Sequence, residues 1–387
     1  MDYRLKILFI INLAVSLGFA VSDAYFSLYA GSIGARGLMF AFAVGGYFAA
    51  KIFFSPFTGM LCDKIGSGRM IMASTAVYSI IALSYVFFND LLIVTALRIL
   101  QGLAAAMFRP VILASAGSLA PRTRRASSMG AFDISFYAAT AAGPLLGGII
   151  RDTFGFSGLF LLLSALCISA FAASVLYALD AVERVSSDED GTSFSDVIKN
   201  PVVAALLAFI FGRAFTISAL CIFLPIYLEQ TMGLSPFRTG IVMSLSTIVM
   251  IVFLRPMGVL ADRYPKNLMI ISGGLYTGML LVFLPLVESY YGILLICGLV
   301  GVFSAMSQPA CSALLIEEGE RMGLGKTAGV FNGALNLGFA VAPLAGSLIL
   351  SFLGIRFVFY FAGVSAMLAM LVSSYLMISF SPVEADI

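Results

Sequence analysis

The chain has 387 residues, of which 61% are hydrophobic and only 11% are charged. Soluble domains contain about 45–50% apolar and about 25% charged residues, so a soluble fold has no way to bury this much apolar surface. The net charge of +2 is too small to indicate nucleic-acid binding. The absence of histidine excludes sites built on a histidine ligand or base, and the five cysteines are scattered without metal spacing.

Long apolar runs, separated by Gly, Pro or charged residues, predict an all-α membrane protein. A hydrocarbon core of about 30 Å takes about 20 apolar residues of helix, and the runs lack the period-two alternation of a transmembrane β-barrel. The first run is too long for a signal peptide, so we expect it to be a retained helix. The twelve predicted helices span residues 5–29, 37–61, 70–88, 91–119, 127–150, 157–179, 201–228, 236–260, 267–287, 291–316, 325–351 and 356–380.

Two short patterns recur at one spacing. The pattern Gly-x-Leu-x-Asp-basic surrounds Asp63 and again Asp262, which lie 199 residues apart. Pro144 and Pro343, each followed by leucine and a nearby glycine, are also 199 residues apart. A shared offset of two unrelated patterns indicates a tandem duplication. We therefore expect an N-terminal six-helix half over residues 1–180, a cytoplasmic linker over 181–200 and a C-terminal six-helix half over 201–387.

The basic residues of the loops indicate the orientation, because cytoplasmic loops are enriched in Lys and Arg. With the N-terminus inside, the cytoplasmic side carries 13 of these residues and the other side carries 4. We expect both termini in the cytoplasm and the chain in the cell membrane. The cytoplasmic set is Arg4, Lys6, Lys64, Arg69, Arg122, Arg124, Arg125, Arg184, Lys199, Arg263, Lys266, Arg321 and Lys326, and the opposite set is Arg36, Arg151, Arg238 and Arg356.

Twelve helices in two repeats, with Gly-x-x-x-Asp-basic-x-Gly after the second helix and an echo after the eighth, resemble the major facilitator superfamily over essentially the whole chain. The resemblance implies two pseudo-symmetric six-helix bundles around a central cavity, and a conformational latch at the Asp-centred pattern. In the first copy, the basic residue that follows the second glycine, Arg69, comes one place later than in the family pattern. In the second copy, Pro265 replaces that glycine. A loop that merely follows the positive-inside rule is the alternative. The implied latch residues are Gly59, Asp63, Lys64, Arg69, Gly258, Asp262 and Arg263.

The fourth predicted helix carries Arg98-Ile-Leu-Gln101-Gly102. This resembles the buried arginine motif of the family, which is linked to proton transfer in its proton-coupled members. An arginine within an apolar run costs about 2.5–3.5 kcal/mol on insertion scales, so it should face a cavity or a partner. Arg109 follows eleven residues later, which is three turns plus about 20°, so both side chains should share one helix face.

The fifth predicted helix carries Gly143-Pro144-x-x-Gly147-Gly148. This resembles the antiporter motif found mainly in the drug:proton exporters of the superfamily. Proline removes a helical hydrogen bond, and glycine permits a bend and close contact with a neighbouring helix. Ordinary helix packing is the alternative interpretation.

Two acidic residues lie within predicted membrane helices, Asp23 in the first and Asp133 in the fifth. Asp133 and Arg109 lie at similar depths, so they can pair, either as a structural ion pair or as a pair that parts when Asp133 takes a proton. Asp23 is the rival proton carrier. Lys51 is its potential partner or a contact for an anionic substrate, and Arg98 modulates the proton site.

Four basic residues but only two acidic residues lie deep within the predicted membrane helices. This excess of positive charge favours an anionic or zwitterionic substrate over a cationic one. Polar and aromatic residues complete the predicted substrate site, with helix–helix packing as the alternative for each. The predicted substrate-binding residues are Lys51, Arg109, Arg213, Tyr25, Phe132, Tyr137, Gln308, Asn332 and Asn336, with Phe211 and Phe215 as further aromatic walls.

These features predict a secondary active transporter that exports a small amphipathic organic compound in exchange for protons. An organic-anion or zwitterion transporter of the same fold, importing or uniporting, is the alternative. A lipid-modifying enzyme lacks a recognisable nucleophile–base pair or metal cluster, and retained latch residues disfavour a transport-inactive receptor. We expect no catalytic activity and no cofactor. The expected partners are a small-molecule substrate, protons and the lipid bilayer, with no nucleic acid, and the chain is expected to be a monomer.

Overall fold

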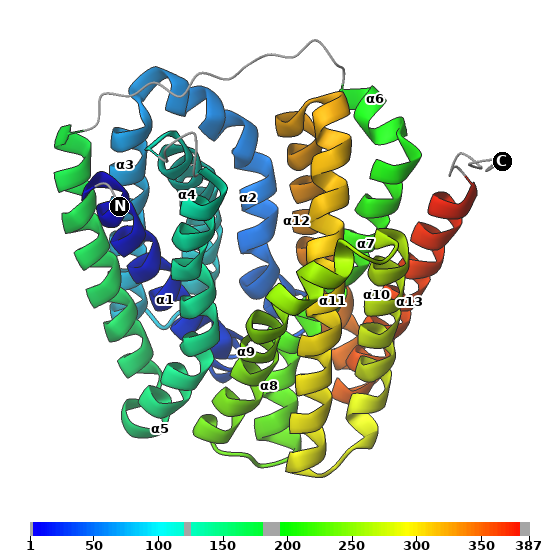
Figure 1. The fold of residues 1–387 in the computed structure, drawn as a ribbon. Coiled ribbons are helices and arrows are strands. Elements are labelled where there is room, and N and C mark those ends of the chain that lie inside the picture. The colour runs from blue at the N-terminus through cyan, green and yellow to red at the C-terminus, as the bar shows by residue number, and fades with distance from the viewer. Residues whose placement is uncertain (1–2, 120–124, 181–193, 380–387) are drawn as a thin grey trace. The chain divides into compact units, whose positions relative to one another are not determined.

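The computed structural model of the chain describes residues 3–119, 125–180 and 194–379, and every element in these ranges is helical (Figure 1). The long helices are α1 (Tyr3–Ser32), α2 (Gly37–Ile65), α3 (Ser67–Phe87), α4 (Leu91–Leu119), α5 (Arg125–Asp180), α7 (Pro201–Ser218), α9 (Pro236–Ala261), α10 (Lys266–Phe283), α11 (Tyr290–Met322), α12 (Leu324–Phe352) and α13 (Ile355–Ser379). The short elements are α6 (Phe194–Lys199), η2 (Ala219–Phe223), α8 (Leu224–Ile226), η3 (Tyr227–Thr231) and η4 (Leu284–Leu286).

Eleven of the described helical segments are long and apolar enough to cross a membrane. Helix α5 has 56 residues and would be about 84 Å long, more than twice the hydrocarbon thickness. Gly155, with φ 66° and ψ −162°, interrupts it, so α5 is two spans, as the predicted helices 127–150 and 157–179 require. The described residues thus contain the twelve expected spans, and the prediction of an all-α membrane protein is confirmed.

The helix ends follow local chemistry. Asp90 accepts hydrogen bonds of 2.9 and 3.1 Å from backbone N–H groups of the following turn and so caps α4. Asn200 caps α7 in the same way, at 2.9 and 3.1 Å, and Pro201 occupies the first helical position, where its missing N–H is not needed. Gly66 separates α2 from α3 with a φ of 86°, a conformation that costs glycine little.

The predicted helix 201–228 is one continuous run of helical turns, from α7 through η2 and α8 to η3. Both η2 and η3 are π-helical, and they flank Pro225. Proline has no backbone N–H and its ring crowds the carbonyl group one turn before it. The hydrogen-bond ladder therefore widens around Pro225, which accounts for the π turns.

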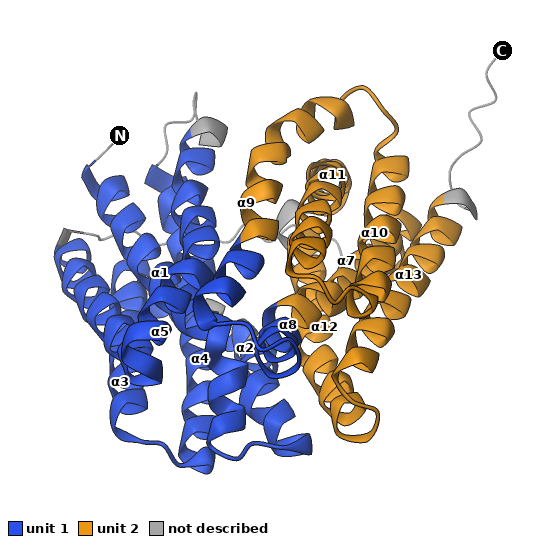
Figure 2. Ribbon diagram, turned by 90° about the horizontal axis from the view of Figure 1, so that it is seen from below, with its two compact units in different colours: residues 1–188, 221–244 blue, residues 189–220, 245–387 orange. Residues whose placement is uncertain are grey.

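The chain packs into two compact units (Figure 2). Unit 1 comprises residues 1–188 and 221–244, and unit 2 comprises residues 189–220 and 245–387. In unit 1, α1 packs against α5, α2 against α4, and α3 against both α4 and α5. In unit 2, α7 packs against α12 and α13, and α10 packs against α11 and α13. The division into halves at residues 181–200 stays a prediction, since residues 181–193 lie outside the described part of the chain.

Small residues bring the helices of unit 1 into close contact. Gly102 of α4 faces the backbone of α2, where an added Cβ would lie 3.0 Å from the carbonyl carbon of Tyr47 and 2.9 Å from the Cβ of Ala50. Gly143 of α5 faces α1, where an added Cβ would lie 2.7 Å from the carbonyl carbon of Ala20. Backbone-to-backbone packing of this kind is typical of membrane helices.

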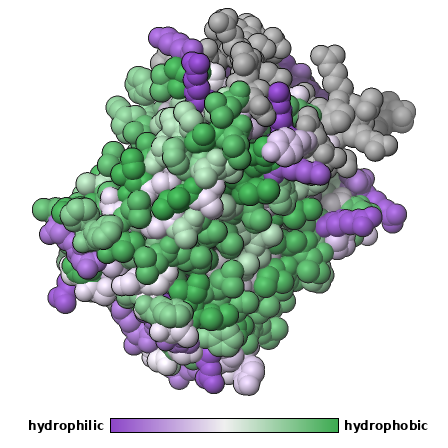
Figure 3. All heavy atoms as spheres, turned by 90° about the vertical axis from the view of Figure 1, so that its left-hand side faces the viewer, coloured by the Kyte–Doolittle hydropathy of each residue, from purple (hydrophilic) through white to green (hydrophobic). Residues whose placement is uncertain are grey.

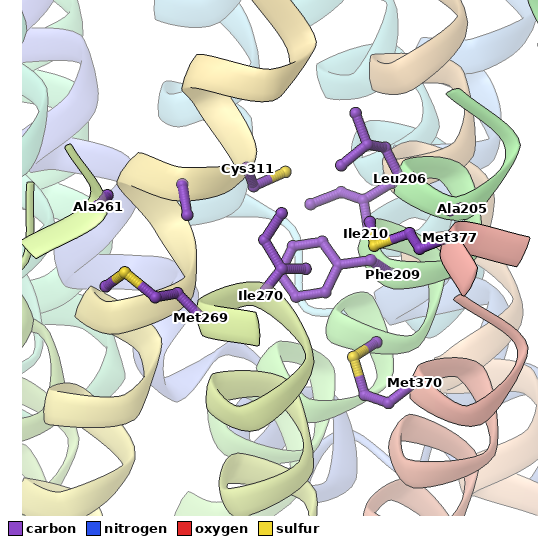
Figure 4. Packing of buried hydrophobic residues seen from close by; sticks show 11 residues of the cluster. Ala205, Leu206, Phe209, Ile210, Ala261, Met269, Ile270, Cys311, Met370 and Met377 are labelled. Carbon is purple, nitrogen blue, oxygen red and sulfur yellow. The ribbon is translucent and has the colours of Figure 1, made fainter. Parts of the chain in front are cut away.

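The core of unit 2 is a cluster of buried apolar side chains from α7, α10, α11 and α13, with Ala261 at the end of α9 (Figure 4). Phe209 and Ile270 lie near its centre, and Met370 and Met377 of α13 close one side. Methionine fills irregular gaps because its side chain is unbranched and flexible. The cluster thus joins four helices of unit 2 through apolar contacts.

The outer surface is apolar where a soluble protein would be polar. Figure 3 shows one face with a broad hydrophobic band and hydrophilic side chains towards its edges. Large apolar side chains such as Ile10 of α1, Ile80 of α3 and Leu161 of α5 are more than half exposed. Exposed apolar surface on this scale marks contact with lipid, as expected for helices that span the bilayer.

The close approach at Gly102 generates a stability prediction. Gly102→Ala should destabilise the fold by about 1–3 kcal/mol, because the new methyl group overlaps the backbone of α2. The matched control is Gly333→Ala in α12, where an added Cβ meets nothing within 4 Å. Thermal unfolding of both variants in detergent tests this, and equal midpoints for the two would contradict the packing described.

Candidate functional site

Unit 1 contains a cavity of about 380 Å³, which lies within the range of about 300–1,000 Å³ of small-molecule sites. Its wall is formed by residues of α1, α2, α3, α4 and α5, with Cys221 and Met243. Three charged residues, Asp23, Lys51 and Arg109, line it together. The aromatic residues of the wall are Phe19, Tyr47, Phe48, Tyr78, Phe108 and Phe136.

Asp23 of α1 forms an ion pair with Arg98 of α4, with 2.6 Å between Asp23 Oδ1 and Arg98 Nη1. The Arg98 side chain is 6% exposed and that of Asp23 is 37% exposed. Arg98 also donates to Gln101 Oε1 at 2.9 Å, and its guanidinium lies 4.0 Å from the centre of the Phe26 ring. The arginine is thus fixed behind the cavity wall, while the carboxylate of Asp23 faces the cavity.

Gln101 completes this arrangement, because its Oε1 also accepts a hydrogen bond of 3.2 Å from the Tyr85 hydroxyl. In the sequence, Gln101 stands out only as part of the helix-four motif, and Tyr85 was not predicted. The position of Gln101, three residues after Arg98 on one helix face, was a usable signal. Tyr85 gave none, since it is one of 15 tyrosines in the chain.

Arg109 of α4 lies beside Asp133 of α5, with 3.9 Å between Arg109 Nη2 and Asp133 Oδ1. Arg109 Nη1 also donates to Asn12 Oδ1 at 3.3 Å, and Asn12 Nδ2 donates to Ser135 Oγ at 2.7 Å. Arg98 and Arg109 therefore both reach α1, as their eleven-residue spacing predicts. Asn12 was missed, although a polar residue within an apolar run is a signal of an interhelical partner.

Lys51 of α2 lines the same cavity. The potential partner named for it from the sequence was Asp23, but Asp23 pairs with Arg98 instead. Of the residues that the structure describes, none forms a hydrogen bond or ion pair with Lys51. The site therefore contains a cation without a counter-charge from the described chain.

The structure places Tyr25 and Phe132 away from the cavity wall, and both are fully buried. The Tyr25 hydroxyl donates to the carbonyl groups of Pro144 at 3.0 Å and Pro236 at 2.9 Å. It thus joins α1 to α5 and to the start of α9. Tyr137 is half-buried, and its ring contacts that of Phe136, with 5.7 Å between the two centres.

The glycines of the fifth-helix motif serve close packing. An added Cβ at Gly147 would lie 2.7 Å from the Val21 carbonyl oxygen, and one at Gly148 would lie 2.6 Å from that of Pro236. Pro144 itself lines the cavity together with Thr140. Since proline has no N–H, it leaves the Thr140 carbonyl group, one turn earlier, without its helical hydrogen bond.

The other predicted substrate residues belong to unit 2. Arg213 donates to Ser307 Oγ at 3.4 Å, beside a void of about 10 Å³, which has room for about one water molecule. The amide groups of Asn332 and Asn336 donate to carbonyl groups of their own helix. Gln308 and Phe211 are half-buried and Phe215 is buried.

The predicted latch residues are only partly described. Gly59 and Asp63 lie in α2, but outside the residues whose side-chain surroundings the structure describes. Lys64 and Arg69 are exposed at the junction of α2 and α3, and Asp262 and Arg263 are exposed after α9. Gly258, also of the second copy, has no heavy atom closer than 3.9 Å to an added Cβ, so it does not mediate a close helix contact.

Four further ion pairs of the described residues were not predicted, and two of them join residues far apart in the sequence with both side chains at most about half exposed. Arg151 of α5 pairs with Glu229 of η3 at 2.5 Å, with side chains that are 15% and 12% exposed. Lys266 at the start of α10 pairs with Glu317 of α11 at 2.5 Å. In the sequence, Arg151 and Lys266 serve only as markers of membrane orientation, and the spacing of their partners along the chain carries no helical signal.

The sequence profile of the Major Facilitator Superfamily matches residues 8–323 and 210–385. The chain is 24% identical over 379 residues to an uncharacterized MFS-type transporter of Methanocaldococcus jannaschii, covering 96% of this chain and 98% of that one. It is 25% identical over 338 residues to multidrug resistance protein 2 of Bacillus subtilis, covering 84% and 83%. It is 26% identical over 314 residues to the multi-drug resistance efflux pump PmrA of Streptococcus pneumoniae, covering 79% and 78%.

Solved structures show the same fold. A POT family transporter in complex with 5-aminolevulinic acid superposes with a TM-score of 0.78, covering 99% of this chain and 96% of that one, at 14% identity. A second POT family structure, with a thioalcohol-conjugated peptide, gives a TM-score of 0.76 at 15% identity.

The two ion pairs of the site should differ in strength. Double-mutant cycles in detergent unfolding, with Asp23→Asn and Arg98→Gln, should give a coupling energy in the upper part of the usual range of about 0.5–3 kcal/mol. The cycle with Asp133→Asn and Arg109→Gln should give less, because its atoms are 3.9 Å apart rather than 2.6 Å. A larger coupling for the second pair would contradict the geometry.

Proposed function

This chain belongs to the major facilitator superfamily, and from that premise we propose that it exports a small amphipathic organic compound by proton-coupled alternating access. The cavity in unit 1 carries the proposal, because it combines an aromatic wall with three charged side chains. An apolar wall with a few placed polar groups is the usual form of a small-molecule site. The multidrug resistance relatives support export as the direction of transport.

We place the coupling proton first at Asp23 and second at Asp133. Asp23 is the carboxylate that lines the cavity, so a proton there and a substrate in the cavity affect each other's binding. Protonation removes the charge that holds Arg98 at 2.6 Å. The contact between α1 and α4 then weakens, which gives the proton a means of changing how these helices pack.

Other residues act on conformation instead of binding the substrate or the proton. The Asp63 and Asp262 patterns are proposed as the cytoplasmic latch, and the glycines around Pro144 as a bending and packing point of α5. We place both termini in the cytoplasm and the chain in the cell membrane, as a monomer that contains the whole pathway. The protein moves its substrate and carries out no chemical reaction on it.

Transport in proteoliposomes tests the proposal. Wild-type protein with a pH-sensitive dye trapped inside should show proton movement when a transported compound is added, and Asp23→Asn should reduce this movement at least about tenfold. Asp133→Asn should have the smaller effect, because Asp133 does not line the cavity.

The control is Asp90→Asn, an exposed acid whose helix-capping role asparagine also fills. It should transport like the wild type. If substrates move without protons, or if Asp23→Asn behaves like Asp90→Asn, proton coupling through Asp23 is wrong.

A further inference from the structure

The charges around the cavity in unit 1 do not cancel. Asp23 is paired with Arg98 and Asp133 lies beside Arg109, so four of the five charged groups have partners. Lys51 is the fifth, and it has no hydrogen bond or ion pair with any described residue. Three cations and two anions leave one net positive charge at the cavity.

Lys51 is not placed where it can reach the ends of its helix. It lies 14 residues from each end of α2 (Gly37–Ile65), which is about 21 Å of helix on either side. A charged side chain at membrane depth costs about 2.5–3.5 kcal/mol on insertion scales, and such residues mark substrate or ion pathways. A structural role would require a counter-charge from the protein, which the described residues do not supply.

Part of the cavity wall is aromatic. Tyr47 and Phe48 of α2, Tyr78 of α3 and Phe108 of α4 line the cavity together with Lys51. Rings of this kind bind flat apolar groups by stacking and edge contacts. A lysine ammonium is a compact point charge with three donors, which suits a single anionic group at one end of an apolar molecule.

We propose that the cavity binds an organic monoanion, a carboxylate or sulfonate on an aromatic or otherwise apolar body, with the anionic group at Lys51. The volume of about 380 Å³ lies near the small end of ligand sites and limits the body to a small molecule. As a substrate assignment this rests on the proposed transport function, whereas the binding site itself can be measured without transport.

Three probes with one apolar body and different head groups separate the alternatives: phenylbutyrate, phenylbutanol and phenylbutylamine, each radiolabelled. Saturable binding to purified protein should be tightest for phenylbutyrate. Lys51→Gln should weaken phenylbutyrate binding about tenfold or more, the value of a lost charge-assisted hydrogen bond. It should leave phenylbutanol binding within about twofold, and Lys51→Arg should keep most of the affinity for phenylbutyrate.

The matched control is Lys6→Gln, which removes an exposed lysine of α1 and should change none of the three affinities. Thermal unfolding separates binding from folding, because removing a cation without a partner should not lower the unfolding midpoint of Lys51→Gln. Tightest binding of phenylbutylamine, no saturable binding of phenylbutyrate, or unchanged phenylbutyrate binding in Lys51→Gln would overturn the anion site.

Transport measured with the same probes shows which claim has failed. Phenylbutyrate that binds through Lys51 but never crosses the proteoliposome membrane leaves the anion site standing and contradicts the proposed function. Phenylbutylamine that is transported with proton movement, unaffected by Lys51→Gln, supports the proposed function and overturns the anion site.

Discussion

A charge inside the bilayer is costly unless another group pairs with it, and this constraint organises unit 1. Helix α4 carries two arginines, and both reach α1, one at Asp23 and the other at Asn12. Helix α5 approaches the second arginine with Asp133. The polar contacts therefore determine which faces of α1, α4 and α5 meet. Apolar faces alone would not, because an apolar side chain contacts lipid as readily as another helix.

Small residues make these polar contacts geometrically possible. Gly143 and Gly147 allow α5 to lie backbone to backbone against α1, and the Tyr25 hydroxyl joins α1 to the carbonyl group of Pro144. Asp23 stands two residues before Tyr25, on the side of α1 that lines the cavity. The fifth-helix motif thus has a physical role that is independent of its association with exporters, since it sets the position of the helix that carries the cavity carboxylate.

The sequence predicted the membrane spans, which depend on local composition. It did not predict which of several similar side chains, distant in the sequence, pair with one another. Apolar run length gave the twelve spans, and Gly155 divides α5 where the runs divide. Helical spacing correctly put Arg98 and Arg109 on one face, and similar depth in the membrane put Arg109 near Asp133. Nothing local distinguished Arg98 from Lys51 as the partner of Asp23, because both are cations on other helices. Tyr25 appeared as an aromatic wall because its hydroxyl partners, two backbone carbonyl groups, have no signature in the sequence.

Alternating access through the cavity in unit 1 requires that this cavity open in turn to each side of the membrane. Cys221 is exposed and lines this cavity, so it is a native probe once the other four cysteines are replaced by serine or alanine. The direct measurement is its labelling by a membrane-impermeant maleimide in right-side-out and inside-out vesicles. If the cavity is the transport site, Cys221 should be labelled from both sides and protected by a bound substrate. Labelling from one side only under every condition, or no protection by a transported compound, would contradict it.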